Sequence, residues 1–444
     1  MRLNSLIYMY ILSFLLVSSG NAQIVYNDDE LWHGFEIESF VCKYHYPPDT
    51  PVYAVNFIDH NTPAATPYLD SSRYHTLRSN LSNCRLRFER FKIGRVAFLG
   101  GSITYNPGWR DMVCDYLKER FPDTEFEFIA AGIPSMGSTP GAFRLERDVL
   151  SKGTVDLLFE EAAVNDRYNG RTSQEQIRAM EGIVRHARES NPAMDIVFMY
   201  FVDPLKMDNY TNGHIPPVLQ KHESVAEHYD IPSINLAKEV TDRIAAGEFT
   251  WEDDFKNLHP SPFGQKIYFQ SMKTFLENTW RGTLSEDAAI IDHTLPGKLN
   301  HGCYDKGKFV SISEAKPDDG WKLVDGWVPD DDAGTREGYV NVPMLIAGTP
   351  GAELQLSFEG SAVGISVAAG QDAGMIEFSI DNGSIREIDL FTQWSAQLHL
   401  PWFHVLNADL EPGKHVLRIK IGSSKNPESK GHSCRIAHFI INGN

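Results

Sequence analysis

The chain has 444 residues, of which 42% are hydrophobic and 23% are charged, and its formal net charge at pH 7 is −18. This length predicts two or three domains, each with a core of its own. The acidic balance argues against nucleic acid as a partner, because phosphate binding needs clustered lysine and arginine side chains and the sequence shows no basic face.

The first 22 residues have the pattern of a cleaved secretory signal. Arg2 is followed by an apolar stretch at 6–17 and by the small residues Gly20, Asn21 and Ala22. The apolar stretch is too short to cross a bilayer, and no later stretch approaches 18 uninterrupted apolar residues. We therefore expect a secreted or periplasmic protein without a membrane span.

Residues 23–90 contain many aromatic and turn-forming residues but no long periodicity, so we expect an N-terminal extension packed on the next domain. From 91 to 285, short apolar runs alternate with helical patterns. This alternation predicts parallel βαβ units in a three-layer α/β domain. The predicted strands are 95–99, 125–130, 155–162 and 195–201, and the predicted helices are 109–120, 173–190, 216–229 and 264–279.

A polar, turn-rich stretch at 286–299 predicts a linker, after which the pattern changes to alternating polar and apolar residues. Residues 300–444 therefore predict an all-β, jelly-roll-like sandwich that could bind carbohydrate. The clearest alternating stretches are 354–358, 363–367, 376–380 and 416–420.

Polar residues follow the predicted strands of the α/β domain. Gly100-Gly101-Ser102 comes directly after the first strand, Asn165 follows the third, and His259 precedes the last helix. Ligands of open α/β sheets bind beyond the carboxyl ends of the strands, so these groups are expected to meet at one edge. A serine hydroxyl needs a base that takes its proton, and histidine has the unperturbed pKa nearest neutrality. We therefore predict Ser102 as the nucleophile and His259 as its base.

With Gly132 at the end of the second predicted strand, residues 90–280 resemble the SGNH hydrolases, the GDSL-like esterase superfamily, in a divergent carbohydrate-active branch. The resemblance implies a flavodoxin-like parallel sheet and ester hydrolysis without a cofactor. The expected oxyanion donors are the backbone N–H groups of Ser102 and Gly132 and the side-chain amide of Asn165.

The chain departs from the family pattern at three positions. Gly101 stands where the family usually has aspartate, Ala163 stands where it has glycine, and Lys256 replaces the aspartate three residues before the histidine. A lysine cannot accept a hydrogen bond from an imidazole. We expect Asp254, or its neighbour Asp253, to orient His259; a backbone carbonyl as acceptor and a catalytic Lys256 remain open.

Substrate-binding residues are expected around this edge and in the β domain. Arg144 and Arg167 follow the second and third strands, and with Lys256 they would suit an anionic sugar, because a guanidinium matches carboxylate or sulfate groups. Trp394 and Trp402 are expected to stack on sugar rings, to line the active site or to belong to the core.

Two further patterns concern the β domain and the cysteines. Pro401 breaks the alternation at 398–402, which predicts a loop rather than a central strand.

Five cysteines in an exported chain allow at most two bridges, and Cys114 lies in a helical stripe that suggests a buried thiol. The candidate pairs are Cys42 with Cys84 and Cys303 with Cys434.

No metal site or phosphate-binding loop is expected, since His214, His222 and His228 do not have metal-ligand spacing. The leading hypothesis is an exported carbohydrate esterase that removes acetyl or similar groups from a polysaccharide or oligosaccharide. One alternative is a lyase or dehydratase acting on uronic-acid-containing oligosaccharides, in which Lys256 or a histidine removes a proton next to a carboxylate. A non-catalytic glycan-binding protein is the other.

Overall fold

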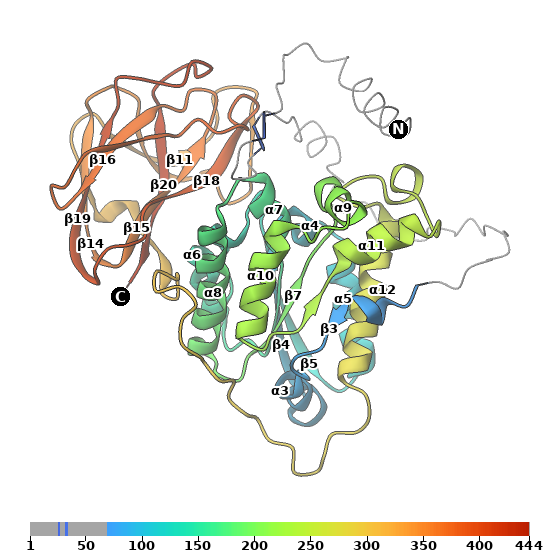
Figure 1. The fold of residues 1–444 in the computed structure, drawn as a ribbon. Helices are drawn as coiled ribbons and strands as arrows, with labels where there is room; N and C mark the ends of the chain where they lie inside the picture. The colour runs from blue at the N-terminus through green and yellow to red at the C-terminus, as the bar shows by residue number, and fades with distance from the viewer. Residues whose placement is uncertain (1–24, 27–31, 34–68, 444) are drawn as a thin grey trace.

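The computed structural model describes residues 25–26, 32–33 and 69–443, which form an α/β domain and a β-sandwich (Figure 1). The predicted signal at 1–22, Cys42 and most of the predicted extension lie outside these residues. Two short strands, β1 (Val25–Tyr26) and β2 (Trp32–His33), pair antiparallel. None of the helices in the described ranges has the length and apolar character that a membrane span requires.

The α/β domain is built on a six-stranded sheet whose order is β3-β8-β7-β6-β4-β5. Five strands run parallel, and only β3 is antiparallel to its neighbour. Because β5 and β6 pair with opposite sides of β4, the strand order reverses next to β4. Such a switch point leaves a crevice at the carboxyl ends of the strands. The strands are β3 (His75–Thr76), β4 (Ile93–Gly100), β5 (Glu125–Gly132), β6 (Leu157–Glu160), β7 (Asp195–Met199) and β8 (Ser233–Ile234).

Helices cover both faces of this sheet and give the predicted three layers. Helices α6, α8 and α10 lie on one side, and α5 and α12 lie on the other (Figure 1). The α-helices are α3 (Ser82–Leu86), α4 (Ser102–Tyr105), α5 (Trp109–Arg120), α6 (Ser138–Asp148), α7 (Ala163–Tyr168), α8 (Ser173–Ser190), α9 (Pro204–Thr211), α10 (Pro217–His228), α11 (Leu236–Ala245) and α12 (Pro262–Thr279). The short helical turns are η2 (Ser71–Tyr74), η3 (Arg87–Phe91), η4 (Leu150–Lys152), η5 (Trp251–Phe255) and η6 (Ile312–Glu314).

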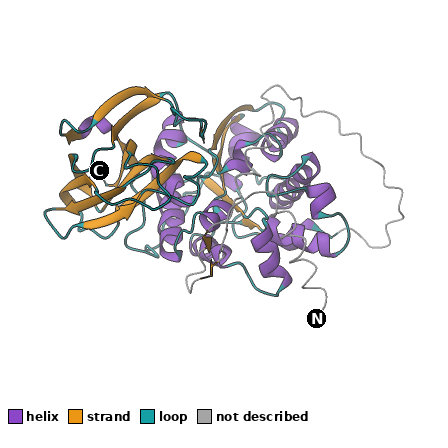
Figure 2. Cartoon of the chain, turned by 90° about the horizontal axis from the view of Figure 1, so that it is seen from above, coloured by secondary structure: helices purple, strands orange, loops and turns teal. Residues whose placement is uncertain are grey.

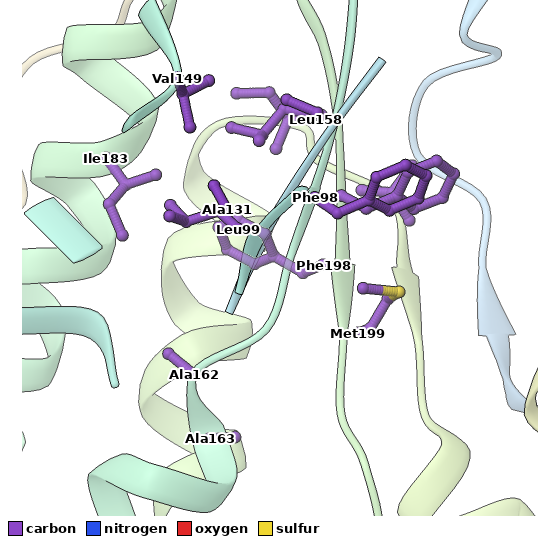
Figure 3. Close-up of a cluster of buried hydrophobic side chains, with 14 of the residues drawn as sticks. Phe98, Leu99, Ala131, Val149, Leu158, Ala162, Ala163, Ile183, Phe198 and Met199 are labelled. Atoms are coloured by element: carbon purple, nitrogen blue, oxygen red, sulfur yellow. The ribbon is translucent and has the colours of Figure 1, made fainter. Parts of the chain in front are cut away.

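The central strands are buried on both faces, which explains their continuous apolar runs. Phe98 and Leu99 of β4 are at most 1% exposed, and Phe98 stacks on Phe159 of β6 with ring centroids 5.3 Å apart. Figure 3 shows Leu99, Ala131 and Ile183 among the side chains of this core, so β4, β5 and α8 contribute to one cluster.

The C-terminal region is a sandwich of two mainly antiparallel sheets, as the alternating sequence predicts. One sheet has the order β10-β14-β19-β16-β17; the other has β11-β13-β20-β15-β18-β12, and β9 pairs with β20. Its strands are β9 (Gly307–Val310), β10 (Ala315–Pro317), β11 (Lys322–Trp327), β12 (Gly334–Thr335), β13 (Val342–Ala347), β14 (Glu353–Gly360), β15 (Ala362–Ala369), β16 (Met375–Ile380), β17 (Arg386–Asp389), β18 (Leu398–Asn407), β19 (Gly413–Ile421) and β20 (Cys434–Asn442).

The centre of the seven-stranded sheet is buried on both faces because it also packs on the α/β domain. Every residue of β15 is buried. Val363, Ile365 and Val367 belong to the interior of the sandwich, whereas Ala362 and Ala368 join the core cluster of the α/β domain. Figure 2 shows the two regions side by side. The core of the α/β domain therefore continues across the interface into the outer face of this sheet.

The loop predicted at 398–402 is wrong, because these residues begin strand β18. Pro401 pairs with Ala368 of β15 on one side. On its other side β18 pairs with β12 only at Leu398 and His399. The ring nitrogen of Pro401 is therefore tolerated, since no described strand needs a donor there.

The predicted bridge between Cys303 and Cys434 is also wrong. Cys84, Cys114, Cys303 and Cys434 are free thiols. The Cys303 carbonyl accepts a hydrogen bond from Asn442, which ends β20, while Cys434 begins that strand. Eight residues of extended chain separate the two ends by about 26 Å, far more than a disulfide allows. Cys114 is half-buried rather than fully buried.

The segment before β9 approaches helix α8 closely at Gly182, and a substitution there tests this approach. A Cβ at this position would lie 2.7 Å from the backbone carbonyl of Tyr304. Alanine in a helix normally stabilises by about 1 kcal/mol relative to glycine. We expect Gly182→Ala instead to lower the free energy of unfolding by about 1–3 kcal/mol, because backbone must shift. Denaturant unfolding measures the change, and Gly297→Ala is the matched control because its Cβ would meet open space. A stabilised Gly182→Ala protein would contradict the close approach.

Candidate active site

Ser102 lies at the switch point of the sheet. Strand β4 ends at Gly100, Gly101 precedes α4, and Ser102 is the first residue of that helix, with 8% of its surface exposed. Asn165 is on α7, which follows the neighbouring strand β6. Two adjacent parallel strands therefore bring both residues to the same edge, although Asn165 is 63 positions later in the sequence.

His259 completes the contact with Ser102. Its Nε2 atom lies 2.7 Å from Ser102 Oγ, so the ring can take the hydroxyl proton. Its backbone N–H donates to Asn257 Oδ1 at 2.7 Å. Asn257 thus shapes the turn that carries His259, a role that its sequence position alone did not indicate.

The imidazole is held in its neutral form. Burial, with a smaller contribution from the positive charge of Arg336, lowers the pKa of His259 to about 4. A neutral ring is the form that accepts a proton, so His259 is competent as a base over most of the physiological pH range.

The structure corrects the expectation that Asp254 orients His259. Asp254 Oδ2 accepts hydrogen bonds from the backbone N–H of Thr250 at 2.8 Å and from its hydroxyl at 3.1 Å. Asp253 is exposed and donates its own N–H to Thr250. Within residues 69–443, no carboxylate hydrogen-bonds the His259 ring, so the described arrangement is a serine–histidine dyad.

Lys256 is exposed in the turn before His259, and its φ of +82° lies in the left-handed region. This geometry lets the chain turn between η5 and α12. Among the described residues, Lys256 makes no hydrogen bond to Ser102 or His259. Its role in substrate binding remains a prediction.

Gly101 is needed because the Asn165 side chain occupies the space beside it. A Cβ on Gly101 would lie 1.9 Å from Asn165 Oδ1, so no other residue fits without moving the amide. The family pattern has aspartate at this position, and the close packing explains why this chain has glycine. The Asn165 amide is thereby fixed next to the residue that precedes the nucleophile.

The predicted oxyanion donor Gly132 lies beside the same helix. A Cβ on Gly132 would meet the backbone nitrogen of Tyr105 at 2.4 Å. Ile133 donates its N–H to the Gly100 carbonyl, so the alternating ladder turns the Gly132 N–H away from β4. Its role as a donor remains a prediction.

Gly137 is a second glycine near the nucleophile that the sequence interpretation missed. It precedes α6, and the carbonyl of Met136 before it lies 3.3 Å from where a Cβ on Gly101 would be. A Cβ on Gly137 would itself meet Asp166 Oδ1 at 2.2 Å. A glycine shortly after the second predicted strand was the available signal.

Asp166 fixes the helices around this edge. Its fully buried carboxylate accepts hydrogen bonds from the backbone N–H and the hydroxyl of Ser138, at 2.8 and 2.6 Å, and contacts His222 Nε2 at 2.9 Å. It therefore ties α7 to the start of α6 and to α10. His222 therefore has a structural partner in Asp166.

The structure also corrects the expectation for Arg144. This side chain is 1% exposed; it donates to the Gly100 carbonyl at 2.9 Å and pairs with Asp148 at 3.0 Å. Arg144 thus supports the strand end below Ser102 and is not open to an anionic substrate. Arg167 is half-buried on α7, two residues after Asn165, and its contact with substrate remains a prediction.

The two predicted aromatic residues lie at the interface between the domains. Trp394 is 8% exposed and packs with Leu398, Leu400 and Tyr168, so it belongs to a small core cluster. Trp402 is half-buried, with the Arg171 guanidinium 5.1 Å from its ring centroid. Tyr168 ends the helix that carries Asn165, which favours a supporting or lining role over a separate sugar-binding face.

Gly101→Ala tests the placement of Asn165. The added methyl group must displace the Asn165 amide, so we expect kcat for ester hydrolysis to fall about 100- to 1000-fold, as when one oxyanion donor is lost. Turnover of a small aryl ester measures this, with Gly297→Ala as the control. Unchanged kcat in Gly101→Ala would contradict a fixed Asn165 amide in the reaction.

Comparisons with known proteins bear on the family and the fold of the chain. Residues 98–267 match the model of the GDSL-like lipase/acylhydrolase family. Two crystal structures of a two-domain esterase active on acetylated mannans, one co-crystallised with mannopentaose, align with 82% of this chain and with 95% and 96% of their own. The sequence identities are 21% and 20% and the TM-scores 0.64 and 0.63, a likeness that establishes the shared fold. A search of curated proteins gives no match. Residues 98–267 thus form a domain of the GDSL-like lipase/acylhydrolase family.

Proposed function

We propose that the protein is an exported carbohydrate esterase that removes acetyl or similar acyl groups from a polysaccharide or oligosaccharide. The observation that carries this proposal is the 2.7 Å contact between Ser102 Oγ and His259 Nε2 at the switch point of the sheet. The family of the domain supports acyl transfer to water, and the shared fold with an esterase active on acetylated mannans supports a sugar ester as substrate.

The first half of the reaction uses the dyad directly. His259 Nε2 takes the proton of Ser102 while Oγ forms a bond to the acyl carbonyl carbon. The bond between that carbon and the sugar oxygen then breaks, and the leaving oxygen takes the proton from His259. The products are the sugar hydroxyl and an acyl ester on Ser102.

The second half returns the enzyme to its starting state. His259 takes a proton from water, whose oxygen attacks the acyl carbon, and the carboxylic acid leaves as Ser102 regains its proton. Negative charge develops on the carbonyl oxygen in both halves. The candidate donors to this oxygen are the backbone N–H groups of Ser102 and Gly132 and the side-chain amide of Asn165.

The structure favours hydrolysis over the lyase alternative. Lys256, the residue that motivated proton abstraction, is exposed, whereas Ser102 and His259 are in contact within a largely buried site. The buried Arg144 also removes one of the groups expected to hold an anionic sugar. A neutral acetylated glycan is therefore the better-supported substrate.

Active-site variants test the proposed chemistry on an acetylated mannan oligosaccharide. We expect Ser102→Ala to lower the rate of acetate release at least about 1000-fold, because no nucleophile remains, and Asn165→Ala to lower it about 100-fold. Asp254→Asn is the contrast: since Asp254 bonds Thr250 and not His259, we expect a change of less than about tenfold. Circular dichroism checks that each variant is folded.

These variants also distinguish the alternatives. Acetate release by Ser102→Ala at the wild-type rate would overturn covalent catalysis, and an unsaturated uronate product would support the lyase. Loss of activity in Asp254→Asn comparable to that in Ser102→Ala would show that the carboxylate turns to His259 during catalysis.

The pH dependence of kcat/KM tests the environment of His259. The base must be neutral, and its pKa is lowered to about 4, so activity should persist to about pH 5 and decline as pH falls through about 4. An unperturbed histidine would give a decline near pH 6.5. A decline of kcat/KM centred near pH 6.5 would show that burial and Arg336 do not lower the pKa of His259 in the free enzyme.

A further inference from the structure

Arg336 of the β-sandwich reaches a loop beside the nucleophile. It follows strand β12 and is 7% exposed, so it is buried between the two domains. Its Nε and Nη2 atoms donate to Ser135 Oγ at 3.4 and 3.2 Å. Ser135 lies in the loop between β5 and α6 that leads to Gly137, and its carbonyl accepts from Asn169 at 2.9 Å.

Glu337, the next residue, makes a second contact, with the helix that carries the nucleophile. Its Oε2 atom accepts a hydrogen bond from the Tyr105 hydroxyl at 2.8 Å. Tyr105 is the last residue of α4, the helix that begins with Ser102. The sandwich therefore contacts both the loop after β5 and the helix that begins with Ser102.

The charge of Arg336 acts on the catalytic base. Next to burial, this guanidinium is the group that lowers the pKa of His259. Such an effect requires the guanidinium to lie within electrostatic range of the imidazole. The contact with Ser135 and the effect on His259 together place Arg336 near both the Ser135 loop and the catalytic base.

The chemistry of the reaction says which half of the substrate lies there. His259 gives its proton to the leaving oxygen, so the alcohol half of the ester must lie beside His259. In the proposed reaction that half is the sugar. A guanidinium offers several N–H donors to hydroxyl and ring oxygens, and a carboxylate accepts from hydroxyl groups.

We propose that Arg336 and Glu337 complete the active site from the second domain and bind the sugar half of the ester. Arg336 thereby determines specificity for the alcohol, and it positions the loop at Ser135. This inference rests on the proposed esterase function and deepens it. It differs from the expected stacking by Trp394 and Trp402, because the recognition is polar and lies beside the base.

The test compares two acetyl esters that differ in their alcohol. One is 4-nitrophenyl acetate, whose leaving group needs little recognition, and the other is an acetylated mannan oligosaccharide. For Arg336→Gln in the full chain, we expect kcat/KM for the oligosaccharide to fall about 10- to 100-fold more than for the aryl acetate. Arg336→Lys should recover part of the loss, and Glu337→Gln should show the same selectivity with a smaller effect.

The pH profile gives an independent readout. Removing the positive charge of Arg336 should raise the pKa of His259, so the acid limb of the Arg336→Gln profile should move to higher pH. Arg418→Gln is the matched control. This half-buried arginine of β19 donates to Asn382, in the turn after β16, and its sheet faces away from the α/β domain (Figure 1). We expect the control to match the wild type in both assays.

The outcomes separate the two proposals. If the wild type releases no acetate from either ester, the esterase function fails. A second outcome is an active wild type with Arg336→Gln and Glu337→Gln variants that lose kcat/KM equally on both esters, or lose none. If the acid limb of the Arg336→Gln profile also stays in place, the role in sugar binding is overturned. Thermal unfolding of each variant shows whether an equal loss comes from a damaged fold.

Discussion

The packing of helix α6 between the sheet and the sandwich is the constraint on which the active site depends. On one side α6 packs on α8 and β4, and on the other it packs on β9 and β20. Asp166 bonds the first residue of α6, and Arg144 in its middle donates to the carbonyl of Gly100. One helix therefore fixes both the end of the strand before Ser102 and the position of the second domain.

The groups that fix this helix are buried and charged, which makes the arrangement specific. Desolvating a charge costs free energy unless partners compensate for it, and removing one partner of such a pair typically costs about 3–5 kcal/mol. Arg144 has Asp148 and a carbonyl, and Asp166 has Ser138 and His222. Each partner comes from a fixed direction, so the buried charges define where α6 and α7 lie. The helices at the catalytic edge are thus held by buried polar contacts as well as by the apolar core.

The sequence allowed the architecture to be predicted because its signals are local. Buried parallel strands appear as continuous apolar runs and the sandwich strands as alternating ones, so most were located to within a few residues. Ser102, Asn165 and His259 were recognisable because strand ends converge at one edge. The loop at 398–402 was predicted because of Pro401. Whether a strand tolerates proline depends on which strands pair with it, and the sequence does not show this pairing.

The errors and omissions at the site have the same physical origin. Asp254 was chosen for its distance along the chain from His259, but the turn directs its carboxylate to Thr250. Arg144 was taken as accessible because its helix begins near the strand ends, yet the sandwich covers that helix. Arg336 is more than 200 residues from Ser102 in the sequence. Only the docking of one domain on another brings it close, and no local pattern encodes that docking.

The burial of β15 on both faces bears on whether the sandwich can exist apart from its neighbour. A carbohydrate-binding domain that is exchanged freely between enzymes needs a soluble surface where it leaves its host. Here Ala362, Ala368, Phe403 and Ile440 of the sandwich are packed into the core of the α/β domain. Cut away from its neighbour, the sandwich would present these apolar side chains to water and tend to self-associate. The sandwich therefore depends on the α/β domain to cover this face and is not a portable module.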